Sequence, residues 1–306
     1  MSHPTSGFAA ALTLVIALAA MGTSAAADPL ADRIAHFTRD FQGNVWLYAK
    51  NLYSGKEFAL RAGEPVRPAS TIKLPILCGV AAEVAAGRAS WDEKLTIRAA
   101  DKVSGSGVLT ELADGTVLPL RDLTNLMIVV SDNTATNVVL ERVPSDTINA
   151  FLDTLGLTRT RTLRKIRGDG TALKAPSGWS TAGKLPENQR YGIGVSTPRE
   201  MVRLLELLEQ GKVVSPEASA QIVAVLKRQQ FKDGIGRRAE GFEVASKSGA
   251  LDALRSDVGI AYTQGGRIAM AITVDGMPKT DYSPDNAGNL LIWELASALR
   301  EGLARR

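Results

Sequence analysis

The sequence contains one cysteine, Cys78, and only two histidines, His3 and His36. A lone cysteine cannot form a disulfide within the chain, so the fold must be stabilised by its core. A Cys/His zinc site is excluded, because the sequence has no paired cysteines and no H-E-x-x-H motif, and no phosphate-binding loop motif occurs either. A Ser-His-Asp triad would need His36, which we interpret as an ordinary helix-surface residue. We therefore expect neither a metal ion nor another cofactor.

The sequence also lacks an apolar run of the roughly 20 residues that a membrane-spanning helix needs. Its longest candidate, Phe8–Ala20, is shorter, and residues 1–27 contain no Lys, Arg, Asp or Glu. The small residues Ala25–Ala27 follow, as in a signal peptide that is cleaved before Asp28. The usual basic segment at the start is missing, which leaves an uncleaved membrane anchor as the alternative. We expect export to the periplasm or secretion, without stable membrane insertion after cleavage.

Strong charge is absent as well, since the 306-residue chain has a formal net charge of +4. Lysines and arginines are spread along it, with no basic run beyond Arg159–Lys165, so we expect no nucleic-acid partner. The sequence has no internal repeat and no linker after the signal peptide. Its one long Gly/Pro/Ser-rich stretch, Ala175–Gly194, exceeds the length of an ordinary connection. We expect a single domain over residues 28–306 and a monomer.

Strand patterns occur at both ends of this domain, with helical patterns between them. An amphipathic helix comes first, and the last helix follows the late strands. The predicted helices at the ends are 28–41 and 283–302, and the predicted strands are 44–51, 56–61, 242–249, 256–263 and 267–276. Early and late strands pair most simply in one mainly antiparallel sheet that the terminal helices cover.

The predicted fold class is therefore α/β plus all-α. We assign the α/β part to about 28–69 and 197–306, and an inserted helical part to about 70–196. Apolar residues recur at three and four spacings through most of that insertion, including one continuous helical run over residues 120–143.

The stretch "PASTIKLPI" places Ser70 three residues before Lys73 in an otherwise apolar helical run. Side chains at this spacing lie on one helix face, with Cβ atoms about 5–6 Å apart. Burial of a lysine disfavours its ammonium form, so the amine can serve as a base for the serine. Free N–H groups at the helix start can hold an oxyanion. The pair predicts a serine nucleophile that needs no histidine.

Two triplets accompany this motif: "SDN" at Ser131–Asn133 in the helical part, and "KSG" at Lys247–Gly249 near the end of a strand. Each alone is also a common cap or turn sequence. In this order the three motifs resemble the S-x-x-K, S-D-N and K-T-G set of class A β-lactamases and penicillin-binding proteins. The chain is similar to the class A β-lactamase family over most of its length, in "GSGVL" (105–109), "LMIVVSDNTATN" (126–137), "STPREM" (196–201) and "SKSGALDALRSDVGIAY" (246–262).

The resemblance implies a β-lactamase/transpeptidase-like fold and a role for each motif residue. Ser70 would be the acylated nucleophile, Lys73 its proton partner, and Ser131 the relay that protonates the leaving lactam nitrogen, with Asp132 structural. The substrate-binding residues implied are Asn133 for the side-chain amide, Lys247 and Ser248 with Gly249 for the carboxylate, Arg255 as a further carboxylate contact, and the N–H groups of Ser70 and Ala250 as the oxyanion hole.

The sequence departs from the family where a loop glutamate should activate water for release of the acyl group. The expected stretch, residues 161–176, contains no glutamate and only Asp169, in a "GDG" turn. Glu187, followed directly by Asn188, is the one loop glutamate before the "STP" helix start. We predict that the loop folds back and brings Glu187 beside Ser70 and Lys73. Asp169, or no carboxylate at all, is the alternative.

These features predict a serine hydrolase that opens β-lactam rings through an acyl-enzyme on Ser70 and so confers antibiotic resistance. Without a carboxylate to activate water, the chain would instead be an acylated but non-hydrolysing penicillin-binding sensor or sink. A D,D-peptidase or esterase that uses the same serine is the third hypothesis.

Overall fold

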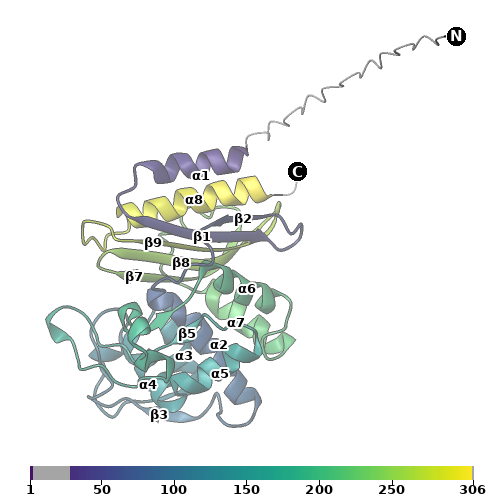
Figure 1. Ribbon diagram of the computed structural model, residues 1–306. Coiled ribbons are helices and arrows are strands. Elements are labelled where there is room, and N and C mark those ends of the chain that lie inside the picture. The colour runs from purple at the N-terminus through teal and green to yellow at the C-terminus, as the bar shows by residue number, and fades with distance from the viewer. Residues whose placement is uncertain (3–27, 305–306) are drawn as a thin grey trace.

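The computed structural model describes residues 1–2 and 28–304, so nearly all of the predicted signal peptide lies outside the described residues. Its main feature is a five-stranded sheet of order β2-β1-β9-β8-β7, in which every neighbouring pair is antiparallel (Figure 1). The strands are β1 (Asn44–Asn51), β2 (Glu57–Leu60), β7 (Glu243–Leu251), β8 (Leu254–Thr263) and β9 (Gly266–Asp275). The predicted pairing of early with late strands is confirmed.

Asn51 explains why β1 ends where it does. Its side-chain Oδ1 accepts hydrogen bonds from the N–H groups of Tyr53 and Ser54, which closes the turn toward β2. Its Nδ2 donates to the carbonyl oxygens of Gly265 and Leu303, so one buried side chain joins two turns of the sheet to the end of the last helix.

Helices cover both faces of the sheet. The terminal helices α1 (Pro29–Arg39) and α8 (Ala287–Leu303) pack on one face, and α6 (Pro198–Glu209) packs on the other (Figure 1). Successive side chains of β9 point to opposite faces of the sheet and so contribute to both cores. Met270 faces the terminal helices, while Ala271 belongs to the core on the α6 side. The β7 edge is left beside the helical part.

The helical part surrounds one buried helix, α2 (Lys73–Ala85). Its neighbours are α3 (Leu120–Val129), α5 (Ser145–Thr154) and α7 (Pro216–Lys227). Residues 73–81 of α2 are all buried, which is why its sequence is apolar nearly all round. Cys78 is among them, and burial raises the pKa of its thiol.

The predicted continuous helix over residues 120–143 is wrong. The helix is interrupted between α3 and α4 (Asn133–Arg142), where Ser131 has φ +54°. Asp132 caps α4 by accepting a hydrogen bond from the Ala135 N–H, and its other oxygen accepts from the N–H groups of Val108 and Leu109. These bonds to a distant loop stabilise a break that helical periodicity does not reveal.

Smaller elements complete the helical part and the long loop. They are the strands β3 (Lys94–Thr96), β4 (Val117–Pro119), β5 (Arg161–Thr162) and β6 (Gly194–Val195), and the 3-10 turns η1 (Ala69–Ile72), η2 (Leu109–Glu111), η3 (Gly170–Ala172), η4 (Ala182–Lys184) and η5 (Pro186–Tyr191). Together the elements confirm the mixed fold, an antiparallel sheet with a helical insertion. Within the described ranges, none of the helices is both long and apolar enough to span a membrane.

Candidate active site

Ser70 lies in the 3-10 turn η1, which continues directly into α2. The residue before it, Ala69, has φ +48°, a left-handed conformation that is unfavourable for alanine and is typical of strained functional turns. Strand β7 passes so close that a Cβ at Gly249 would lie 2.9 Å from Ser70 N and from Pro68 O. The glycine of "KSG" is therefore needed for the edge strand to approach the serine.

Lys73 is fully buried below Ser70, at 0% exposure. Its Nζ donates to the carbonyl oxygen of Ser131 at 2.7 Å, to Ser131 Oγ at 3.2 Å and to Asn133 Oδ1 at 2.8 Å. Burial lowers the pKa of Lys73 well below its usual value, the nearby charge of Lys247 lowers it further, and Asp132 opposes the shift. Within the described part of the chain, Lys73 makes no hydrogen bond to Ser70 Oγ, so the contact expected from their spacing is not formed.

The residues of the "SDN" triplet make two kinds of contact. Ser131 and Asn133 hold the lysine, and Asn133 Nδ2 also donates to the carbonyl oxygen of Ser104 at 3.0 Å. Asp132 serves the backbone, as its bonds to α4 and to Val108 show. The positive φ of Ser131 aims its short side chain at the lysine, a feature that the sequence did not predict.

Lys247 of β7 is the second fully buried lysine. Burial lowers its pKa to about 7, and the charge of Asp257 on the neighbouring strand opposes the shift. Burial also raises the pKa of Asp257 to about 6. Asp257 Oδ2 accepts from the Ile235 N–H at 2.9 Å, whereas its Oδ1 is buried without a hydrogen-bond partner among the described residues. Lys247 and Asp257 thus titrate close to neutral pH.

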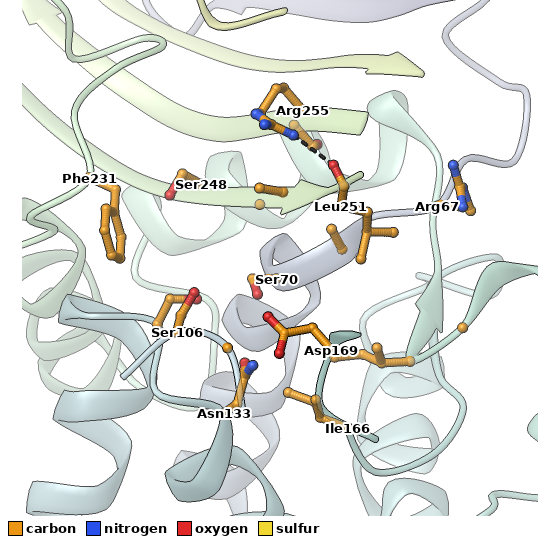
Figure 2. Close-up of a pocket in the computed structure, with 18 of the residues that line it drawn as sticks. Arg67, Ser70, Ser106, Asn133, Ile166, Asp169, Phe231, Ser248, Leu251 and Arg255 are labelled. Atoms are coloured by element: carbon orange, nitrogen blue, oxygen red, sulfur yellow. Dashed lines mark hydrogen bonds between the residues drawn. The ribbon is translucent and has the colours of Figure 1, made fainter. Parts of the chain in front are cut away.

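A cleft of about 450 Å³ runs between the β7 edge and the helical part. In Figure 2, Ser70 lies between Ser248 on one side and Asn133 on the other. The structure brings together at the cleft wall the predicted residues Ser70, Ser131, Asn133, Ser248, Gly249, Ala250 and Arg255. Lys73 and Lys247 lie behind this wall. Exposed His36 belongs to α1, a helix on the far face of the sheet.

Arg255 reaches the cleft from behind β7 (Figure 2). Its Nη1 donates to the carbonyl oxygens of Leu251 and Leu254, both at 2.6 Å, and its Nη2 donates to that of Asp281. The guanidinium also lies over the Tyr282 ring, 4.8 Å from the ring centroid. Most of its donors are therefore committed to the protein, and the other side chains expected to receive the carboxylate are Lys247 and Ser248 of β7.

Glu187 does not reach the cleft, contrary to the predicted folding back of its loop. It lies exposed on η5 and is not one of the residues that line the cleft. Its neighbour Asn188 donates to the carbonyl oxygen of Ala182 at 3.0 Å. Through that bond Glu187 and Asn188 form part of the local structure of the loop.

The loop segment that does line the cleft contains Ile166 and Asp169. Asn137 holds it in place: Asn137 Oδ1 accepts from the Ile166 N–H at 2.8 Å, and Nδ2 donates to the Ile166 carbonyl oxygen at 3.0 Å. Figure 2 shows the Asp169 carboxylate directed toward Ser70 and Asn133. The Asp169 N–H also donates to Ser104 Oγ at 2.9 Å, which fixes the turn.

Metal chemistry has no set of ligands in the residues that the structure describes, because no cluster of three or more His, Cys, Asp or Glu side chains is placed to bind an ion. The site contains instead a serine hydroxyl at a cleft, a buried lysine amine with a lowered pKa, and a second buried lysine on the edge strand β7. Such groups suit nucleophilic attack on a carbonyl carbon.

Comparison with known proteins agrees with this geometry. Residues 29–303 match the family described as "Beta-lactamase enzyme family". The chain belongs to the beta-lactamase enzyme family. A beta-lactamase from Sphaerobacter thermophilus has a similar crystal structure, with TM-score 0.76 and 30% identity over 89% of this chain and 96% of that one. Membership of this family implies that the chain is a hydrolase.

Two further relatives are more distant. The beta-lactamase of Rhodobacter capsulatus is 25% identical over 274 residues, which are 87% of this chain and 85% of that protein. A variant of the last common ancestor of the class A beta-lactamase of Gram-negative bacteria shares the fold, with TM-score 0.73 and 22% identity over 89% of this chain and 97% of that one.

Proposed function

We propose that this beta-lactamase family member opens β-lactam rings through an acyl-enzyme on Ser70. The observation that carries the proposal is the buried amine of Lys73, which is bonded to Ser131 and Asn133 directly behind the Ser70 turn. A lysine in this setting is predisposed to be neutral and to accept a proton. We also propose that the enzyme acts as an exported monomer, in the periplasm or secreted.

Acylation begins when Ser70 Oγ attacks the lactam carbonyl carbon. The hydroxyl proton passes to the neutral amine of Lys73, and the carbonyl oxygen becomes an oxyanion that the N–H groups of Ser70 and Ala250 receive. The C–N bond then breaks, and Ser131 Oγ, which bonds to Lys73, delivers a proton to the leaving nitrogen. The product is an ester of Ser70.

The substrate carboxylate is assigned to the β7 side of the cleft. We assign it to Ser248 Oγ, which lines the cleft, and to the charge of Lys247, buried next to it on β7, with further positive charge from Arg255 on β8. Asn133, on the opposite wall, is assigned the amide of the acyl side chain. This places the lactam ring across Ser70, with its two substituents on opposite walls.

Release of the ester needs a base for the attacking water, and we assign this role to Asp169. Of the three aspartates that line the cleft, Asp257 is buried beside Lys247, and Asp233 belongs to the segment after α7. Figure 2 shows the Asp169 carboxylate directed toward Ser70. This carboxylate takes a proton from water, and the water oxygen attacks the ester carbon. As the C–O bond to Ser70 breaks, Ser70 Oγ regains the proton from Asp169. If Asp169 fails to do so, the protein is a penicillin-binding sensor or sink.

The decisive experiment combines mass spectrometry with turnover. Intact protein quenched in acid shortly after mixing with benzylpenicillin should carry the mass of one penicillin as a transient adduct, and Ser70→Ala should not. Ser106→Ala removes another hydroxyl that lines the same cleft and should still be labelled. Equal labelling of the wild type and Ser70→Ala would refute the mechanism.

Steady-state turnover then separates the three hypotheses. Hydrolysis of a chromogenic cephalosporin supports a β-lactamase, a stable adduct without turnover supports a sensor or sink, and cleavage of a D-Ala-D-Ala peptide in place of the cephalosporin supports a D,D-peptidase.

A further inference from the structure

The wall of the cleft opposite β7 carries two arginines, Arg164 and Arg167, which the proposed mechanism does not use. They belong to the stretch 159–190, which contains eight basic and two acidic residues, although the whole chain has a formal net charge of only +4. Positive charge is therefore concentrated on this stretch. Two of these eight basic residues face the space in which the substrate is expected to lie.

The two arginines are held by uncharged partners. Arg164 Nη1 donates to the Lys165 carbonyl oxygen at 2.9 Å, and its guanidinium lies 5.5 Å from the centroid of the Trp179 ring. Arg167 Nε donates to the Lys174 carbonyl oxygen at 2.8 Å. Within the described residues, neither guanidinium forms an ion pair with a carboxylate. By contrast Arg67, which also lines the cleft, donates to both carboxylate oxygens of Asp275.

The surroundings make an uncompensated charge unfavourable here. Burial lowers the pKa of Arg164, and the charge of Arg167 lowers it further, so the two guanidinium groups repel each other. Both arginines line the cleft, so the space beside them is open to a ligand. An anion in the cleft would relieve the repulsion and bind both groups.

Carboxylates already at the cleft do not remove this charge. Asp257 faces Lys247, and Asp233 lies within the electrostatic influence of Arg237. Asp169 is the one acidic residue on the same loop segment, and it offers one negative charge against two positive ones. The loop wall keeps an excess of positive charge.

We propose that Arg164 and Arg167 form a subsite for a negatively charged group on the acyl side chain of the substrate. This inference rests on the proposed function, which places the ring carboxylate at β7 and the acyl side chain toward the loop. The preferred substrates are then acyl donors with two anionic groups, one at each end of the cleft.

Three penicillins that differ at one position test the proposal: benzylpenicillin, its α-carboxy derivative and its α-amino derivative. Binding is measured by calorimetry to the Ser70→Ala protein, which reports the subsite without chemistry. The α-carboxy compound should bind at least about fivefold more tightly than benzylpenicillin, the upper end for an exposed ion pair, and the α-amino compound should bind less tightly. Added salt should reduce the difference.

Charge reversal at one loop position identifies the residues responsible. In the Ser70→Ala background, Arg167→Glu should reverse the order, so that the α-amino compound binds more tightly than the α-carboxy one. Lys184→Glu makes the same charge change on the same loop at an exposed residue outside the cleft lining, and should keep the original order. Arg164→Gln, checked by near-UV circular dichroism for correct folding, should weaken the preference for the anion.

Equal binding of the three penicillins, or no binding of the α-carboxy compound, would overturn the subsite. So would an order that Lys184→Glu changes and Arg167→Glu does not. Failure of the proposed function looks different: the charge order would persist in the Ser70→Ala protein while none of the penicillins acylates the wild type.

Discussion

The amine of Lys73 donates to both the carbonyl oxygen and the hydroxyl of Ser131, at 2.7 and 3.2 Å. This contact joins the start of α2 to the break before α4. Among the described residues Lys73 makes no hydrogen bond to Ser70 Oγ, three residues earlier, although helical spacing alone would pair those two. A proton taken from Ser70 therefore has a direct onward route, since the group that accepts it already contacts the hydroxyl that must protonate the leaving nitrogen.

Lys73→Ala should slow acylation by at least about 10²-fold, because the hydroxyl then lacks a positioned base. The rate of adduct formation with benzylpenicillin, followed by mass spectrometry, measures this directly. Lys73→Met fills more of the buried space and should be equally slow, which separates loss of the base from a packing defect. Exposed Lys56→Ala serves as the control, and an unchanged acylation rate in Lys73→Ala would exclude the lysine as the base.

A pH dependence follows from the lowered pKa of Lys247, about 7. The ammonium form receives the substrate carboxylate, and it is lost as pH rises through this value. Because kcat/KM reports groups of the free enzyme, it should fall as pH rises above about 7. The bound carboxylate favours the charged lysine, so kcat should keep its value to higher pH.

Two variants test whether Lys247 causes this fall in kcat/KM, the alkaline limb of the pH profile. Asp257→Asn removes the carboxylate that raises the pKa of Lys247, so the fall in kcat/KM should move to lower pH. Lys247→Arg keeps its charge at all relevant pH values, and the limb should disappear in whatever activity remains. A kcat/KM that stays constant from neutral to mildly alkaline pH in the wild type would contradict the assignment.

Gly249→Ala should reduce both stability and acylation. The added methyl would lie 2.9 Å from two backbone atoms, Pro68 O and Ser70 N, which cannot move aside as a flexible side chain can. Overpacking of this kind typically costs about 1–3 kcal/mol of the free energy of unfolding, and here it also displaces the nucleophile. Urea unfolding and the acylation rate measure the two effects. At exposed Gly63, where the nearest atom would be Arg159 Nη1 at 3.9 Å, alanine should change neither.

Local patterns in the sequence were sufficient to predict much of the fold. Alternation identified the strands, and the apolar surroundings of Lys73 predicted its burial, because both depend on residues near in sequence. The break at Ser131 could not be predicted this way, since residues 126–142 keep a helical pattern across it. What stabilises the break is the bonding of Asp132 to Val108 and Leu109, from a loop more than twenty residues earlier.

The loop that borders the cleft was the hardest part to predict for the same reason. The sequence favours Glu187 because Asn188 follows it, which is a local signal. The position of the loop depends instead on Asn137, whose side chain bonds to both backbone groups of Ile166 across 29 residues. Asn137 was visible in the sequence within the family-like segment "SDNTATN", but nothing local indicated its partner.

The last prediction concerns the release of the acyl group. Asp169→Asn should form the Ser70 adduct at nearly the wild-type rate but hold it, with steady-state turnover lower by about 10²–10⁴-fold, as expected when a general base is lost. Glu187→Gln is the matched control, because it makes a comparable carboxylate-to-amide change on the same loop at an exposed residue outside the cleft. It should turn over normally.

Loss of release in Glu187→Gln, with Asp169→Asn unaffected, would mean that the loop moves to bring Glu187 to the ester after acylation. A stable adduct already in the wild type would show that Asp169 does not activate water, and that the protein captures β-lactams without hydrolysing them.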